Sequence, residues 1–134
     1  MENLHEIFKT ISSLKVGVIG DVMLDTYMWG HVDRISPEAP VPVVALDKKD
    51  HRIGGAGNVA LNIQSLGATA FVLSVTGKDE DATTLNELFS KANINTEYII
   101  QSTERITTNK TRIISRNQQM MRLDAEVTTD FLLL

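Results

Sequence analysis

The stretch RIGGAGNVALNIQSLG, residues 52–67, decides how the fold is interpreted, because its glycines lead directly into an amphipathic helical pattern. Its apolar residues recur on one helical face, and Gly67 follows as a residue that ends helices. Residues 55–60, GAGNVA, satisfy the pattern G-x-G-x-x-A of a dinucleotide-binding loop. The same glycines, with Asn58 after them, equally suit a loop that binds a sugar.

The dinucleotide interpretation has one feature for it and two against it. Asp79 follows Gly57 at close to the roughly 20-residue spacing of an acid that binds the ribose. However, residues 47–53, DKKDHRI, are poor material for the buried central strand that such a loop should follow. The apolar run over 16–19 is better material, but it ends in GD at 20–21 without a G-x-G.

The sugar interpretation rests on the chemistry of a few polar groups near the glycines. Gly54 and Gly55 carry no β-carbon, so a ligand can approach their main chain closely. A helix N-terminus adds N–H groups without intrahelical partners. Asn58 both donates and accepts hydrogen bonds, and the Asp25 carboxylate accepts them from hydroxyls. The plain structural alternative is that the glycines form only a turn and Asn58 only a cap.

The rest of the pattern predicts an α/β domain with a parallel sheet. Apolar residues at helical spacing predict three helices, over 3–13, 56–66 and 80–92. Short apolar runs predict two strands, over 16–19 and 69–77. Residues 26–50 contain all three prolines and a short predicted strand over 42–47. The last third contains short extended segments, so we expect a second, antiparallel layer beside the α/β core.

Composition is that of an ordinary globular domain, with 134 residues, 43% hydrophobic and 22% charged. The net charge of −4 argues against a broad basic face for nucleic acid. The chain has no cysteine, which suits a cytoplasmic location, and its three scattered histidines form no zinc-ligand pattern. No apolar run approaches the roughly 18 residues of a membrane helix. We expect neither a metal site nor a membrane contact.

The glycine segment 54–60, GGAGNVA, resembles the first signature of the ribokinase/PfkB (phosphofructokinase-B) carbohydrate kinases. In that signature two glycines precede an asparagine, a small residue follows, and two further glycines come at set intervals. Gly67 and Gly77 match those later positions. The resemblance implies a ribokinase-like fold, in which a Rossmann-like parallel sheet flanked by helices carries a small β-strand lid.

Two longer segments narrow the resemblance within that family. Residues 20–44 and 109–124 are similar to the heptose 7-phosphate kinases, and the resemblance covers roughly 12–126. It implies a domain over 1–134 with lid segments at about 26–50 and 97–124. In many bacteria such a kinase is the first half of a bifunctional kinase/adenylyltransferase that makes ADP-heptose for the lipopolysaccharide core.

The resemblance also implies a reaction. Kinases of this kind transfer the ATP γ-phosphate, with Mg²⁺, to a sugar hydroxyl; here the implied acceptor is the anomeric hydroxyl of D-glycero-D-manno-heptose 7-phosphate. The late motif D-T-x-G-A-G-D, which supplies the catalytic base and the anion hole, is absent from this sequence. We therefore expect an incomplete C-terminal half: a chain that binds the sugar phosphate without turnover, with most of the ATP site outside it.

Site residues are implied at the first strand and the glycine loop, where the sugar hydroxyls would contact Asp25, Gly54, Gly55 and Asn58. Further along, Lys110, Arg112 and Arg116 have the same parity, so an extended strand places three cations on one face. Such a face suits the 7-phosphate, since arginine binds phosphate with two parallel hydrogen bonds. The alternative is a solvated strand face.

Self-association is a further expectation, because an incomplete parallel sheet exposes an edge and an apolar face. The resemblance implies a homo-oligomer, with a dimer contact through the lid. Two other functions stay open beside the sugar kinase. They are a dinucleotide-binding domain and a non-catalytic interaction module.

Overall fold

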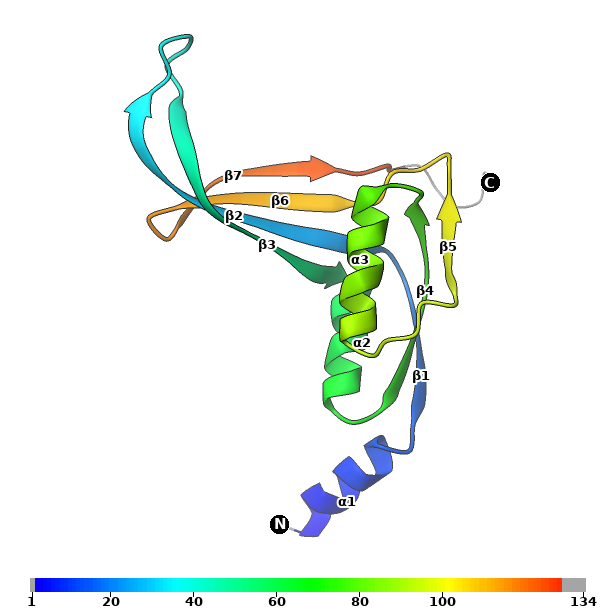
Figure 1. Ribbon diagram of the computed structural model, residues 1–134. Helices are drawn as coiled ribbons and strands as arrows, with labels where there is room; N and C mark the ends of the chain where they lie inside the picture. The colour runs from blue at the N-terminus through cyan, green and yellow to red at the C-terminus, as the bar shows by residue number, and fades with distance from the viewer. Residues whose placement is uncertain (1, 129–134) are drawn as a thin grey trace.

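A computed structural model describes residues 2–128 as two β-sheets that meet at one end of a pair of helices (Figure 1). The elements in chain order are α1 (Glu2–Ile11), β1 (Lys15–Ile19), β2 (Val22–Ile35), β3 (Pro42–Gly55), α2 (Ala56–Ser65), β4 (Thr69–Gly77), α3 (Glu80–Lys91), β5 (Ile99–Ser102), β6 (Asn109–Ser115) and β7 (Gln118–Ala125). The predicted α/β class is confirmed, as are the three predicted helices. The end of the predicted domain, residues 129–134, lies outside the described residues.

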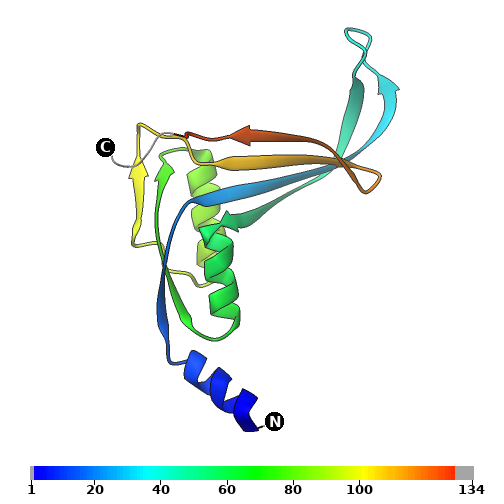
Figure 2. The same ribbon diagram turned by 180° about the vertical axis from the view of Figure 1, so that it is seen from behind.

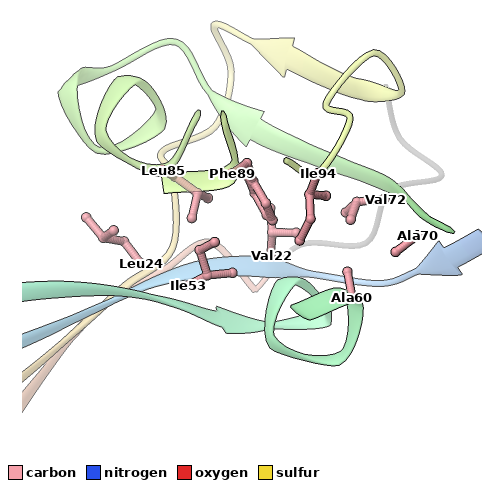
Figure 3. Close-up of a cluster of buried hydrophobic side chains, with 9 residues drawn as sticks. All are labelled: Val22, Leu24, Ile53, Ala60, Ala70, Val72, Leu85, Phe89 and Ile94. Carbon is pink, nitrogen blue, oxygen red and sulfur yellow. The ribbon is translucent and has the colours of Figure 1, made fainter. Parts of the chain in front are cut away.

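The first sheet is parallel, with strand order β1-β4-β5, and helices α2 and α3 cover one of its faces (Figure 2). Its core contains Val72 from β4 and the fully buried Leu85 and Phe89 from α3 (Figure 3). A β-carbon on Gly57 would lie 2.3 Å from Ile53 Cγ2 and 2.8 Å from Phe89 Cζ. This glycine of the loop is therefore required by helix packing.

No helix of residues 2–128 covers the other face of the parallel sheet (Figures 1 and 2). Ile19 is 82% exposed there and Ile100 is 67% exposed. With Leu73 and Tyr98 they line a shallow apolar hollow of about 490 Å³. An uncovered apolar face of this kind is unusual, because parallel sheets are normally buried on both sides.

The second sheet has four strands in the order β3-β2-β6-β7 and projects away from the helices (Figure 1). It is mixed: β2 pairs antiparallel with β3 but parallel with β6. The predicted second layer is present, but it is not antiparallel throughout, because the chain leaves β3, forms the α/β unit and returns parallel to β2. The predicted lid segment 97–124 is also divided, since β5 pairs with β4 in the other sheet.

Strand β3 contains residues 47–53, which are poor material for a buried central strand. They form a strand because most of the four-stranded sheet lies in solvent, where charged side chains are tolerated on a strand. The glycine loop therefore does follow a strand directly. That strand, β3, pairs antiparallel with β2 and does not belong to the parallel sheet. In a dinucleotide-binding unit the glycine loop follows a strand of the parallel sheet, so this loop differs from one.

Candidate functional site

The two faces of the four-stranded sheet carry different chemistry, because alternate residues of a strand point to opposite sides. Leu24 of β2 and Ile53 of β3 face the helices and join the core (Figure 3). Strand register places a set of polar and aromatic residues on the opposite side, which we call the charged face: Asp25, Tyr27, Trp29, Lys48, Asp50, Arg52, Gly54, Lys110, Arg112, Arg122 and Asp124.

Asp25 lies on β2, at the end of the charged face that is nearest the glycine loop. Arg112 Nη1 donates a hydrogen bond to Asp25 Oδ1 at 2.5 Å, and the two side chains are only 22% and 20% exposed. The hydrogen bond to Asp25 raises the pKa of Arg112, so the arginine stays charged. A β-carbon on Gly54 would lie 2.5 Å from Asp25 Oδ2. The carboxylate therefore rests directly against bare main chain.

The glycine loop turns sharply into α2. Gly55 has a left-handed φ of 59°, and a β-carbon there would lie 2.3 Å from the Asp21 carbonyl oxygen. That same carbonyl accepts the Ala56 N–H at 2.9 Å. Gly55 is the N-cap of α2, and no side chain caps the helix. Asn58 is therefore no cap; it lies exposed in the first turn, where its amide is available to a ligand.

The cations of β6 have carboxylate partners. Lys110 Nζ lies 3.6 Å from Asp124 and 3.4 Å from Glu126, while Arg112 binds Asp25. Arg116 is not on the strand, because β6 ends at Ser115. The prediction that it shares a face with the other two cations is wrong.

A tight turn removes Arg116 from the strand face, since it and Asn117 have left-handed φ values of 48° and 66°. The hairpin instead brings Arg122 directly opposite Arg112. Arg122 Nε lies 2.9 Å from Asp124 Oδ1, as an ion pair. Arg122 of β7 thus joins Arg112 on the charged face.

Sequence reasoning missed an aromatic pair in the middle of the charged face. The rings of Tyr27 and Trp29 stack with centroids 5.5 Å apart. Arg52 Cζ lies 4.6 Å from the Tyr27 centroid, and Lys48 Nζ lies 5.1 Å from that of Trp29. Alternation by two in both strands, from Asp25 to Trp29 and from Lys48 to Gly54, is the sequence signal that places these side chains together.

Asp79, the acid that favoured a dinucleotide site, has a structural role. It caps α3 by accepting the Ala82 N–H at 2.8 Å, and it binds Thr107 through the N–H at 2.8 Å and the hydroxyl at 2.7 Å. Burial raises its pKa, but the hydrogen bonds from Thr107 and Ala82 together outweigh burial and lower it. Its oxygens are thereby committed to joining α3 to the segment before β6.

Residues 2–128 contain neither a membrane-spanning helix nor a metal-ligand cluster. No helix in that range has both the length and the apolarity to cross a membrane. The same residues contain no group of three or more histidine, aspartate or glutamate side chains arranged to hold a metal ion.

Solved structures of sugar and nucleoside kinases share this fold. The nucleoside kinase of Methanocaldococcus jannaschii, an archaeal member of the ribokinase family, superposes with a TM-score of 0.63 at 21% identity, over 83% of this chain and 36% of that one. The fructokinase of Xylella fastidiosa, solved with bound ATP, gives 0.61 at 17% identity, over 84% and 33%. The fold is therefore that of the ribokinase-like kinases.

Residues 13–130 match the model of the pfkB family of carbohydrate kinases, and the chain belongs to that family. Among curated proteins, the bifunctional protein HldE of Trichlorobacter lovleyi is 49% identical over 123 residues, which are 92% of this chain and 25% of that protein. The chain spans about a quarter of the length of the curated relatives it matches.

Proposed function

We propose that this chain is the sugar-binding part of a heptose 7-phosphate kinase. The whole enzyme would transfer the ATP γ-phosphate to the anomeric hydroxyl of D-glycero-D-manno-heptose 7-phosphate, in the cytoplasm, on the way to ADP-heptose. Family membership and the HldE relatives support a sugar kinase. The observation that carries the proposal is the contact of the Asp25 carboxylate with the bare main chain of Gly54.

Sugar hydroxyls would bind where that carboxylate meets the glycine loop. Asp25 accepts hydrogen bonds from hydroxyls, and Arg112 holds it in place. The main chain of Gly54 and Gly55 permits close approach, and the uncapped start of α2 offers N–H groups. Asn58 would donate to and accept from a further hydroxyl. Carboxylate, amide and main-chain groups together match the hydrogen-bonding pattern of a polyol.

The phosphate of the sugar would bind further out on the charged face. Arg112 and Lys110 supply positive charge there, although each also has a carboxylate partner. Arg116, in the turn after β6, would contribute only at the far end of that face. The four-stranded sheet would act as the lid over the bound sugar.

ATP and Mg²⁺ belong to the proposed reaction of the whole enzyme, in which the metal would neutralise charge on the transferred phosphate. The residues described here do not provide for the metal, since residues 2–128 contain no candidate ligand cluster. Their part in the reaction is to bind and orient the acceptor sugar.

The four-stranded sheet would also form a dimer contact. Its edge strand β7 is exposed along its whole length, and Met120, Met121 and Leu123 are each about half exposed. An exposed edge with apolar side chains favours pairing with a second copy.

Isothermal titration calorimetry with heptose 7-phosphate tests the proposed function. We expect the 134-residue chain to bind the sugar phosphate, Asp25→Asn to weaken binding at least tenfold, and NAD to give no heat. With ATP and Mg²⁺ present, no bisphosphate should form. Binding of NAD in place of the sugar would favour a dinucleotide domain, and formation of the bisphosphate would refute the proposed lack of turnover.

A further inference from the structure

The charged face presents a second arginine beside the proposed sugar site, on the strand that leads into the glycine loop. Arg52 lies directly opposite Asp25 in the register of β2 and β3, two residues before Gly54. Its side chain is 57% exposed. It therefore lies next to the proposed site and is accessible from solvent.

The hydrogen bonding of Arg52 leaves donors available. Arg52 Nε donates a hydrogen bond to Asp50 Oδ2 at 3.2 Å. Within residues 2–128, the two terminal nitrogens Nη1 and Nη2 have no hydrogen-bond acceptor. Lys110, by comparison, lies between two carboxylates, and Arg112 is engaged by Asp25. Of these three cations, Arg52 has the most donors free to bind an anion.

The aromatic pair fixes where those donors lie. Arg52 Cζ lies 4.6 Å from the Tyr27 ring centroid, and Arg112 Cζ lies 5.3 Å from the same centroid. The two arginines come from β3 and β6, the strands on either side of β2. The Tyr27 ring thus makes a cation–π contact with a guanidinium from each neighbouring strand, and such contacts restrict the motion of both arginines.

We propose that Arg52 and Arg112 form a two-arginine clamp over Tyr27 that binds the phosphate group of the substrate. The inference rests on the proposed function for the identity of the sugar, and it adds Arg52 as the residue that selects a phosphorylated acceptor. Bidentate guanidinium contacts suit a phosphate dianion better than a hydroxyl. The phosphate would lie one step outward from Asp25, so that the sugar extends from the clamp toward the glycine loop.

The test compares heptose 7-phosphate with the unphosphorylated heptose by calorimetry. Arg52→Gln should weaken binding of the phosphorylated sugar at least tenfold and change binding of the free sugar less than twofold. Arg52→Lys, which keeps the charge but loses the planar fork, should fall between. Lys49→Gln is the control, since it removes the same charge from the opposite face of β3.

Each other outcome has a definite meaning. Equal losses for both sugars in Arg52→Gln, or an equal loss in Lys49→Gln, would overturn the clamp, because the effect would then be structural or long-range. If the wild-type chain binds neither sugar, the proposed function fails, and titration with inorganic phosphate decides the inference by itself. Phosphate binding that depends on Arg52 would support the clamp, and its absence would overturn it.

Discussion

Asp25 lies so close to Gly54 that a β-carbon on residue 54 would come within 2.5 Å of Asp25 Oδ2. The two residues belong to neighbouring strands, β2 and β3. The missing side chain at position 54 provides the space that the carboxylate occupies. The other carboxylate oxygen binds Arg112 on β6, so three strands meet at one acidic group.

Gly54→Ala should therefore disturb both the site and the fold. The new methyl group must displace Asp25 or Met23, whose Cγ would lie 2.8 Å away, and overpacking of this kind costs about 1–3 kcal/mol. Sugar affinity should fall roughly tenfold, equivalent to about 1.4 kcal/mol. Urea unfolding and calorimetry measure the two effects. Gly17→Ala is the control, because its β-carbon would meet Leu73 Cδ1 at an ordinary 3.6 Å; unchanged binding in Gly54→Ala would contradict the account.

Arg112→Gln should destabilise the protein more than loss of a surface ion pair does. It leaves a mostly buried Asp25 without its charged donor, a loss of about 1.5–3 kcal/mol for a hydrogen bond of this type. Arg122 lies directly opposite Arg112 in the hairpin and forms an ion pair with Asp124, in which the arginine side chain is half exposed. Arg122→Gln should therefore lower the free energy of unfolding by only about 0–1 kcal/mol. Equal unfolding free energies for the two variants would show that Asp25 does not depend on Arg112.

Stability should depend on pH through Asp79. Its folded-state pKa lies below the ordinary 3.8, so the unfolded chain binds the proton more tightly than the folded protein does. The stabilisation that Asp79 provides is therefore complete above its pKa in the unfolded chain, and it is lost as the pH falls through its pKa in the folded protein. The free energy of unfolding in urea should drop below about pH 4.

Asp79→Asn identifies the source of that pH dependence. The variant should be less stable near neutral pH, by about 1–3 kcal/mol for a lost acceptor at Thr107, and should lose less stability on acidification. Glu80→Gln removes the same charge from the first turn of α3 and should keep the wild-type pH profile. If Asp79→Asn also keeps that profile, the hydrogen bonds to Thr107 do not set it.

The uncovered face of the parallel sheet should make the chain self-associate at micromolar concentration. Ile19 and Ile100 place exposed apolar surface on this face, so Ile19→Thr with Ile100→Thr should reduce association in sedimentation velocity. Met121→Lys with Leu123→Lys tests the edge strand β7 in the same way. A monodisperse wild-type monomer would contradict both proposed contacts.

Elements with a strong helical or apolar pattern could be predicted from the sequence, and the charged strands could not. Helix α2 and strand β4 have the expected bounds because burial of one face imposes a clear period. The strand predicted over 42–47 continues to Gly55 as β3, since a strand that projects into solvent does not need an apolar run. The position of Arg116 was misjudged because parity arguments assume a straight strand, and the turn at 116–117 ends that strand.

Only the part of the candidate site that depends on local sequence could be predicted. The glycine loop and Asp25 have recognisable residue types, but the partner of Asp25 depends on the parallel pairing of β2 with β6, which brings together residues 87 positions apart. Alternation by two places Tyr27 and Arg52 on one face of their strands, but their contact depends on the register of β2 and β3. Pairing between distant strands is information that local pattern does not carry.

Amide chemical shifts in NMR, measured on the 134-residue chain with heptose 7-phosphate, test directly whether the sugar phosphate binds at the charged face. Binding beside Asp25 should shift the amide signals of Gly54, Gly55, Asn58 and Arg112, and leave that of Gly17 in the parallel sheet unchanged. Absence of any shift at saturating sugar phosphate would contradict it. So would shifts confined to the hollow at Ile19 and Ile100, because the sugar would then bind away from the charged face.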